Sequence, residues 1–482
     1  MKFVIKLFPE IIVKSRPVRK QFIAQLRKNL KKVLGPIVEN PKLKGTWDFI
    51  ELDIDEHHES LESLVLARLQ STPGIEFILK VNEHQFNSVE DICQIAVKEF
   101  SQKIEGKSFC VRVKRSGKHP FSSIEVERQS GGALLQQSEA SKVQLKNPDV
   151  EVQMEIRGEQ LMTVVERYEG LGGFPIGQQE SCVSLISGGY DSTVSSYLMM
   201  KRGIRTHFCF FNLGGMAHEV GVKQVAHYMW EKYSSSHRTL FISIPFEEVV
   251  SEILNRVDQS QMGVILKRMM LRVAEKIATE FNAPALVTGE AVGQVSSQTL
   301  TNLSVIDSVC NSLVMRPLIV MDKPEIINLS RQIGTEEFAS VMPEYCGVIS
   351  NKPTTRAKVH KIEKEESRFD FDILERAFAN RKVENIDQIY DSIVNVENVE
   401  IVSLPDKSDI VIDIRHPQEM AVAPLNLTAN DVITIPFYKL QTTDQLDKSN
   451  HYLLYCDKGV MSQLQAEELT SKGYQVKVYQ PK

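Results

Sequence analysis

The sequence lacks long uninterrupted apolar runs. A helix that spans a membrane needs about 20 mostly apolar residues, whereas even the apolar stretch SLVMRPLIVM is interrupted by Arg316 and Pro317. At the start of the chain, MKFVIKLFPEIIVKS carries Lys6, Glu10 and Lys14, which interrupt the apolar core that a signal peptide requires. We therefore expect a cytoplasmic protein with no membrane association.

Cysteine pairs spaced for metal binding are also missing. The seven cysteines lie at positions 93, 110, 182, 209, 310, 346 and 456, and no two of them form a CxxC motif. Zinc and iron–sulfur sites usually need such spacing, so we expect neither. The scatter also excludes a disulfide scaffold, and a cysteine in a reducing compartment is usually a small buried apolar side chain. A reactive cysteine must therefore be argued from its surroundings.

What the sequence does contain is the composition of a soluble protein with several domains. Its 482 residues exceed the usual size of one domain, and 42% hydrophobic and 25% charged residues are ordinary values. The net charge of -5 is unevenly spread, because residues 1–50 carry twelve basic and only three acidic side chains. This end of the chain is either a polyanion-binding face or a solvated helix face, and charge alone does not decide between them.

A second basic segment, KSFCVRVKRSGKHPFSS, combines strand alternation with a basic turn. Val111 and Val113 alternate with polar side chains, and the cations around them suit the phosphates of a nucleic acid. The candidate RNA-binding side chains are Arg112, Lys114, Arg115 and Lys118. Together with the later strand-like run VEVQMEIRGEQ, this segment resembles the THUMP domain of RNA-modifying enzymes. The resemblance implies that the shape of an RNA is read here.

From residue 178 to residue 345 the pattern changes to alternating strands and helices. The apolar runs CVSLI, THFCFFNL, TLFISIPF and PALVTG alternate with helical patterns such as MGVILKRMMLRVAEKIATEF. This alternation predicts a parallel sheet with helices on both faces, in which ligands bind beyond the carboxyl ends of the strands.

The first of these strands ends in LISGGYDSTVSSYL, which predicts a phosphate-binding loop. Gly188 and Gly189 allow the backbone to approach a ligand closely, and Ser187 adds a hydroxyl donor. Asp191 or Ser192 can cap the following helix, whose N-terminus adds a partial positive charge. The loop is shorter than a Walker loop and has no lysine, so transfer of a γ-phosphate is not expected. The alternative is a glycine-rich turn that only caps a helix.

The string SGGYDS resembles the SGGxDS loop of PP-loop ATP pyrophosphatases, which cleave ATP between its α and β phosphates and adenylate a substrate. The resemblance implies that Asp191 helps to hold magnesium or to position the phosphates. Downstream, GEAVGQVSSQT resembles the pocket segment of tRNA 4-thiouridine synthetases. The nucleotide-binding positions that this resemblance implies are Leu185, Ile186, Ser187, Gly188, Gly189, Asp191, Ser192, Lys267, Gly289 and Gln298. Taken singly, Lys267 could be a solvated side chain and Gln298 a helix cap.

The C-terminal tail contains a candidate sulfur carrier. The run HYLLYCDKGVMSQLQAEELTSKGYQVKVY has the pattern strand, loop, helix and strand, and Cys456 lies at the end of its first strand. Backbone N–H groups of the loop would lower the pKa of this thiol and stabilise a persulfide anion. With DIVIDIR, the run resembles a rhodanese domain, although Met461 stands where many thiosulfate-using rhodaneses have arginine, which argues against thiosulfate as the donor. A buried structural Cys456 is the alternative.

The order of these segments resembles the long form of the tRNA 4-thiouridine synthetase family (tRNA uridine 4-sulfurtransferase, ThiI family), which ends in a rhodanese domain. In PEYCGV, Cys346 matches the partner cysteine of that family. The implied architecture is an α/β multidomain chain. Its parts are a ferredoxin-like α+β domain (1–60), a THUMP α+β domain (61–167), a Rossmann-like PP-loop domain with a parallel sheet (178–345), a linker (346–403) and an α/β rhodanese domain (404–482).

The resemblance also implies a function. ATP with Mg2+ would activate uridine-8 of tRNA as an adenylate, and Cys456, loaded by an IscS-type cysteine desulfurase, would deliver persulfide sulfur to form 4-thiouridine. Cys346 would resolve the intermediate through a redox disulfide with Cys456, which a thiol reductant resets. The family further implies sulfur donation to a ThiS-type carrier protein for thiamine thiazole biosynthesis. Another PP-loop adenylating enzyme and a non-enzymatic sulfur-relay or RNA-binding protein remain open, as does the oligomeric state, a homodimer included.

Overall fold

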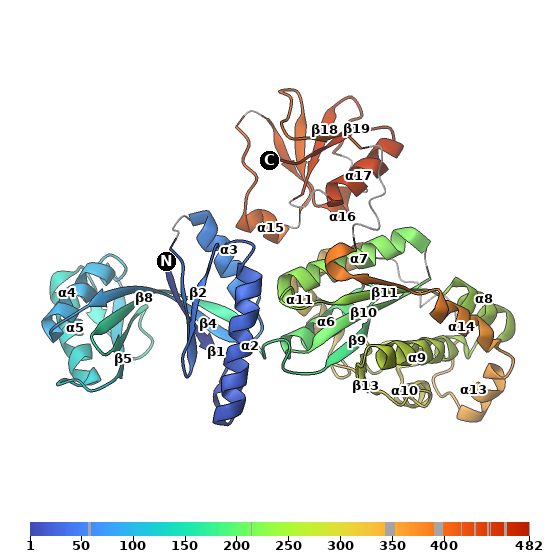
Figure 1. Cartoon of the computed structure of the whole chain (residues 1–482), viewed down its shortest axis with the longest axis horizontal. Helices are drawn as coiled ribbons and strands as arrows, with labels where there is room; N and C mark the ends of the chain where they lie inside the picture. Colours follow the sequence, from blue (N-terminus) through green and yellow to red (C-terminus); the bar gives the residue numbers. More distant parts are fainter. Residues whose placement is uncertain are drawn as a thin grey trace. The chain divides into compact units, whose positions relative to one another are not determined.

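The computed structural model describes residues 1–55, 59–213, 215–342, 352–389, 399–415, 417–428, 430–440, 443, 445–456 and 460–481. The chain divides into two compact units, Met1–Phe174 and Pro175–Lys482. Figure 1 labels their helices and strands. No helix among the described residues combines the length and the apolar character that crossing a bilayer requires.

The N-terminal unit is built on one eight-stranded sheet with the order β2-β3-β1-β4-β8-β7-β5-β6. The strands are β1 (Lys2–Leu7), β2 (Lys42–Gly45), β3 (Phe49–Asp53), β4 (Ile75–Gln85), β5 (Ser108–Ser116), β6 (Lys142–Val143), β7 (Val150–Arg157) and β8 (Gln160–Gly172). β5 pairs in parallel with β6 and β7, whereas β1 pairs antiparallel with β3 and β4. The strands expected in KSFCVRVKR and VEVQMEIR are therefore confirmed as β5 and β7.

In the part of this unit that the structure describes, five helices pack against the sheet. They are α1 (Pro9–Ile12), α2 (Arg16–Leu34), α3 (Glu59–Gln70), α4 (Val89–Phe100) and α5 (Ser123–Gln137). In α2, Phe22, Leu26, Leu30 and Leu34 recur every four residues and are buried, so one face of this basic helix packs on the sheet. Capping boxes start α4 at Ser88 and α5 at Ser122.

The buried apolar side chains of this unit form two large clusters and a smaller third one around Val4, Leu79 and Met162. One large cluster contains Phe3, Leu26 and Ile78, and the other contains Phe86, Phe109 and Leu161. Helix α3 packs into the first large cluster, although the expected boundary at residue 60 would assign it to the second. The domain limits stay a prediction, but the two halves share a continuous sheet because β4 pairs with both β1 and β8.

The second unit contains a six-stranded sheet with the order β13-β12-β9-β10-β11-β14. Its strands are β9 (Ser181–Leu185), β10 (Arg205–Asn212), β11 (Leu240–Pro245), β12 (Ala285–Val287), β13 (Leu313–Met315) and β14 (Lys382–Asn385). The first five are parallel, and β14 closes the edge antiparallel to β11. The parallel sheet predicted from CVSLI, THFCFFNL, TLFISIPF and PALVTG is thus confirmed.

Helices lie on both faces of this sheet (Figure 1). They are α6 (Tyr190–Lys201), α7 (Gly215–Tyr233), α8 (Glu247–Arg256), α9 (Met262–Glu280), α10 (Leu300–Asp307), α11 (Lys323–Ile333), α12 (Glu336–Val341), α13 (Val359–Glu366) and α14 (Phe371–Ala379), with short 3-10 turns η1 (Ser296–Gln298) and η2 (Ile386–Gln388). The segment expected as a linker supplies α13, α14 and β14. Its side chains Ile362, Phe369 and Leu374 belong to the same buried apolar cluster as the side chains of α9. The described part of 346–403 is therefore largely packed onto the second sheet.

The chain ends in a five-stranded parallel sheet with the order β15-β19-β18-β16-β17. Its strands are β15 (Ile401–Val402), β16 (Ile410–Asp413), β17 (Val432–Thr434), β18 (His451–Tyr455) and β19 (Gln475–Tyr479), and its helices are α15 (Pro417–Val422), α16 (Phe437–Leu440) and α17 (Val460–Ser471). The strands predicted in DIVIDIR and HYLLY and the helix and strand that follow are confirmed.

Candidate active site

A cavity of about 620 Å³ opens beyond the carboxyl ends of β9, β10 and β12. Its wall contains every nucleotide-binding residue that the sequence predicted except Gly188. The lining includes the apolar side chains Phe211, Leu266 and Met270, which suit a planar base, and the predicted loop, which supplies N–H and hydroxyl groups. The folding of a parallel sheet brings these segments together because its strands all end at one edge.

The loop Ser187–Ser192 has the geometry of an anion cradle. Gly188 takes a φ of 82°, which a side chain would strain. The expectation that Asp191 or Ser192 caps α6 is wrong, because the helix starts at Tyr190 with Gly189 as its N-cap and both side chains lie in its first turn. Ser192 Oγ accepts a hydrogen bond from the Ser187 backbone N–H at 3.1 Å and donates to the Gly189 carbonyl oxygen at 3.2 Å. His218 Nε2 donates to the Ser187 carbonyl oxygen at 3.4 Å, and burial lowers the pKa of His218. Hydrogen bonds made by Ser192 and His218 therefore fix the loop next to the positive end of α6.

Asp191 lies in the first turn of α6 and is held from two sides. Lys323 Nζ donates to its Oδ1 at 2.8 Å, and Gln294 Nε2 donates to its Oδ2 at 2.8 Å. The Lys323 ammonium also lies 5.4 Å from the centroid of the Tyr190 ring. A role of Asp191 in holding magnesium stays a prediction, and each carboxylate oxygen keeps a second lone pair for such a ligand.

Lys267 forms a buried network with Glu290. Lys267 Nζ donates to Glu290 Oε1 at 2.6 Å, and Arg316 Nε and Thr288 Oγ1 donate to Glu290 Oε2 at 2.8 and 3.0 Å. Burial of Glu290 works against its charge, but the two cations outweigh burial and lower the pKa of this carboxyl group. Lys267 thus faces the cavity as a positioned cation rather than as a solvated side chain.

Gln298 and Gly289 complete the wall in different ways. Gln298 is 8% exposed, and no described residue donates a hydrogen bond to its buried Oε1, so this acceptor is available to a ligand in the cavity. A Cβ added to Gly289 would lie 2.6 Å from the carbonyl carbon of Asp191 and 2.7 Å from the Ser192 nitrogen. Gly289 is therefore required where β12 approaches the start of α6.

The candidate sulfur carrier Cys456 follows β18 and is 8% exposed. The Ser462 backbone N–H donates to its Sγ at 3.3 Å, and the Ser462 hydroxyl lies 3.3 Å from the same sulfur. In the neighbouring strand, Asp413 and Arg415 form a buried ion pair at 2.6 Å that braces the sheet edge. Ser462, at the end of the CDKGVMS segment, thus contacts the sulfur, whereas residues 457–459 lie outside the described residues and the wrapping of the whole loop stays a prediction. Cys346 lies outside the described residues.

The predicted RNA-binding cations lie together at one end of the N-terminal unit. Arg112, Lys114 and Arg115 are on β5, and Lys118 follows in the next turn. All four are exposed. Arg112 Nη2 donates to the Leu145 carbonyl oxygen at 2.9 Å, and Arg115 Nη1 lies 3.1 Å from His119 Nδ1. Both side chains remain exposed, so their charges are accessible to a polyanion.

Two family models match the chain. One, described as Thiamine biosynthesis protein (ThiI), matches residues 177–371, and the other, described as THUMP domain, matches residues 86–165. The chain is 52% identical to a tRNA sulfurtransferase of Shewanella halifaxensis (strain HAW-EB4) over 484 residues, which cover 100% of both chains. The tRNA sulfurtransferase of Shewanella pealeana (strain ATCC 700345 / ANG-SQ1) matches with the same identity and coverage. The chain belongs to the tRNA sulfurtransferase family.

The fold of the chain also resembles that of a solved structure. It is a 4-thiouridine synthetase in complex with RNA and bound ATP, with 29% identity and a TM-score of 0.69, covering 80% of this chain and 99% of that one. PH1313 from Pyrococcus horikoshii Ot3 shares the fold, with a TM-score of 0.54 at 20% identity over 69% of this chain and 100% of that one. The expected family, fold class and enzyme class, a transferase of sulfur-containing groups, are confirmed. The rhodanese assignment of the tail and the roles of single residues stay predictions.

Four side chains that line the cavity were not predicted from the sequence: His218, Glu290, Gln294 and Lys323. Glu290 and Gln294 lie within the quoted segment GEAVGQVSSQT, where attention to buried carboxylates and amides would have found them. Lys323 is the first residue of α11, whose start is marked in the sequence by a capping box of Asp322 and Glu325. The sequence did not show that Lys323 contacts Asp191. His218 carried no sequence signal, because only the fold brings α7 against the loop.

Proposed function

We propose that this chain is an ATP-dependent tRNA sulfurtransferase that adenylates uridine-8 and replaces its O4 with sulfur to give 4-thiouridine. The arrangement that carries this proposal is the cradle Ser187–Ser192 facing Lys267, Lys323 and the unpaired acceptor of Gln298 in one cavity. Such a site binds a nucleotide with its phosphates on a helix N-terminus and its base against apolar side chains. The bound ATP of the 4-thiouridine synthetase to which the chain is similar supports the same ligand.

The residues of the cavity suit adenylation rather than transfer of a terminal phosphate. The cradle and Lys323 would bind the phosphates, and the positive charge there would stabilise the pyrophosphate that leaves when uridine O4 attacks the α-phosphorus. Magnesium, when bound with ATP, would neutralise further phosphate charge, and Asp191, which lines the cavity, would be the carboxylate that holds it. Gln298 and Lys267 would orient the nucleotide from the opposite wall.

Sulfur transfer would follow adenylation in two steps, each of which forms one bond and breaks one bond. A persulfide on Cys456 attacks C4 of the adenylated uridine, so that a C–S bond forms and AMP leaves with the oxygen. Attack of the Cys346 thiolate on Cys456 Sγ releases 4-thiouridine and leaves a Cys346–Cys456 disulfide, which a thiol reductant returns to two thiols. The hydrogen bonds from Ser462 to Cys456 Sγ support this role, because they stabilise negative charge on sulfur.

The partners of this reaction follow from its chemistry. A cysteine desulfurase would load Cys456, and the same persulfide would serve a ThiS-type carrier protein for thiamine thiazole biosynthesis. Transfer RNA would bind the exposed cations Arg112, Lys114, Arg115 and Lys118. The RNA in the complex of the similar 4-thiouridine synthetase supports this ligand class.

The decisive experiment uses purified chain, unmodified tRNA transcript, ATP, cysteine desulfurase and cysteine. We expect thiouridine absorbance, AMP release that depends on tRNA, and loss of the product with Cys456→Ala. Adenylation that needs no tRNA would indicate another PP-loop adenylating enzyme, and absence of AMP would indicate a sulfur-relay or RNA-binding protein. Full product from Cys456→Ala would refute the proposed sulfur route.

A further inference from the structure

Trp47 lies exposed at the tip of the hairpin that joins β2 and β3, outside every site described above. It is 49% exposed, which is unusual for the largest apolar side chain in a folded unit. The turn beneath it is well fixed, because the Thr46 backbone N–H and hydroxyl both donate to the Phe49 carbonyl oxygen, at 2.9 and 3.0 Å. The ring is therefore presented on a rigid turn.

An arginine supports this ring. The Arg19 guanidinium carbon lies 3.6 Å from the centroid of the Trp47 ring, and that of Arg16 lies 5.3 Å away. Arg19 is itself only 9% exposed, and its Nη1 donates to the Ile12 carbonyl oxygen at 2.8 Å. A stacked and anchored guanidinium covers ring surface on one side and holds the orientation of the indole, while nearly half of the residue stays open to solvent.

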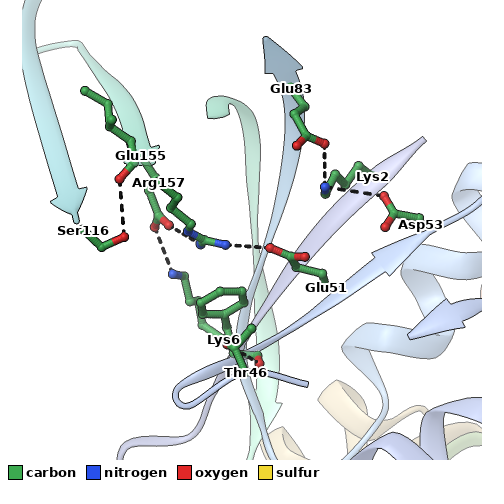
Figure 2. A network of polar contacts seen from close by, with 11 residues as sticks. Lys2, Lys6, Thr46, Glu51, Asp53, Glu83, Ser116, Glu155 and Arg157 are labelled. Carbon is green, nitrogen blue, oxygen red and sulfur yellow. Dashed lines mark hydrogen bonds and ion pairs between the residues drawn. The ribbon is translucent and has the colours of Figure 1, made fainter. Parts of the chain in front are cut away.

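The base of the same hairpin is held by a network of charged side chains (Figure 2). Arg157 Nη1 donates to Glu51 Oε1 at 2.6 Å, and Glu155 accepts from Arg157 at 2.5 Å and from Lys6 at 2.9 Å. The Phe49 ring lies between cations, with Arg157 at 3.8 Å and Lys6 at 4.9 Å from its centroid. These side chains are less than a fifth exposed, so the network ties β3 to β1 and β7 and fixes where the tip points.

The surface beside Trp47 is strongly basic. Helix α2 contains no acidic residue, and its exposed cations Arg16, Lys20, Arg27 and Lys31 recur at spacings of four, seven and four residues, which places them in one stripe. The stripe adjoins the hairpin, because a Cβ added to Gly45 would lie 2.7 Å from Arg27 Cδ. A rigid, exposed aromatic ring next to a row of cations is the arrangement that binds single-stranded nucleic acid, by stacking on a base and pairing with phosphates.

We propose that Trp47 is a stacking platform for an unpaired base of the RNA substrate and that the α2 stripe binds the phosphates next to that base. The choice of RNA as the ligand rests on the proposed function, whereas the platform itself follows from the geometry. A paired base hides both faces within the helix stack, so the platform selects nucleotides at an RNA end, loop or bulge. This platform would be a second RNA-binding surface, formed by a different part of the sequence from the predicted RNA-binding residues Arg112 to Lys118.

Tryptophan fluorescence tests the platform directly, because the chain has only Trp47 and Trp230. In full-length protein carrying Trp230→Phe, the emission reports Trp47 alone. We expect strong quenching by a short two-stranded RNA duplex with an unpaired 3′ overhang and little quenching by the same duplex with blunt ends, which has no unpaired base. Equal signals from the two RNAs, or none from either at saturating concentration, would overturn the proposal.

Affinity provides the second test. Trp47→Ala should raise the Kd for unmodified tRNA roughly 5- to 100-fold, as expected for loss of one stacked base. Trp47→Phe keeps an aromatic face and should restore most of the affinity. The slope of log Kd against log salt concentration should stay unchanged in Trp47→Ala, whereas Lys20→Ala should lower it by about 1. Wild-type Kd in Trp47→Ala, or no rescue by Trp47→Phe, would contradict the platform.

The two proposals fail separately. If the chain forms no thiouridine but Trp47→Ala still weakens RNA binding, only the proposed function is wrong. If thiouridine forms and depends on Cys456 while Trp47→Ala binds tRNA as the wild type does, only the platform is wrong. Circular dichroism spectra of Trp47→Ala and Trp47→Phe show whether the substitution of Trp47 alters the fold.

Discussion

The Lys323 ammonium donates a 2.8 Å hydrogen bond to Asp191 Oδ1 and thereby joins the start of α11 to the start of α6. A cation is unfavourable at a helix N-terminus, whereas a carboxylate is favourable there. Lys323 therefore needs a nearby anion, and Asp191 provides one. A phosphate in the cradle would compete with Asp191 for this cation and could release the carboxylate. The pair is thus placed to respond to nucleotide binding.

We predict that Lys323→Ala lowers tRNA-dependent AMP formation by about 100-fold, because it removes a positive charge aimed at the phosphates. Lys323→Arg should retain part of the activity. Lys276→Ala is the matched control, since Lys276 is equally exposed at 39% and pairs with Glu375 away from the cavity. Single-turnover release of AMP is the measurement. Equal activities of Lys323→Ala and Lys276→Ala would contradict the assigned role.

Sulfur loading should be specific to Cys456. With cysteine desulfurase and radiolabelled cysteine we expect label on Cys456, none in Cys456→Ser, and roughly tenfold slower loading in Ser462→Ala, which loses a hydrogen bond to the charged sulfur. Cys182 serves as the internal control, because burial raises the pKa of its thiol to about 12 and leaves it protonated at neutral pH. Peptide mapping that finds the label on Cys182 would show that burial does not protect it.

Glu290→Ala should destabilise the second unit by about 1–3 kcal/mol at pH 7, because Lys267 loses its carboxylate partner and Arg316 keeps only Asp307. The folded-state pKa of Glu290 is lowered, so its contribution is present above the ordinary value of 4.5 and is lost as the pH falls below it. The difference from wild type should shrink in that acid range. Urea unfolding followed by Trp230 in a Trp47→Phe background measures it, with the exposed Glu375→Ala as control.

His207 should make the same unit acid-sensitive at milder pH. Burial, aided by Arg205, lowers its pKa from 6.5 to about 4, and its Nδ1 accepts a hydrogen bond from the Leu240 backbone N–H at 3.0 Å. Between pH 6.5 and pH 4 the proton binds mainly to the unfolded chain, so the free energy of unfolding decreases as the pH is lowered. At pH 5 this decrease is about 2 kcal/mol relative to neutral pH. His207→Gln keeps an acceptor without titrating and should show a flatter profile in the same urea assay. The exposed His360→Gln should retain the full slope.

Local sequence determined the elements that depend on neighbouring residues. The run CVSLI followed by SGGYDS specified a strand, a phosphate loop and a helix start, because glycine conformations and capping act within a few residues. The alternation in SFCVRVKRS likewise specified β5 and the exposure of Arg112 and Lys114. The identity of the family followed from such short motifs and their order along the chain.

Tertiary structure alone decided which distant side chains meet. Asp191 and Lys323 are separated by 132 positions, and Trp47 meets Arg19 across 28 positions, so no local pattern could pair them. The segment expected as a linker supplies an edge strand and two helices, because its apolar side chains pack against α8 and α9, which are distant in the sequence. Periodicity shows which face of an element is apolar, but the partner of that face, and every ion pair in the cavity, follows from how the elements pack.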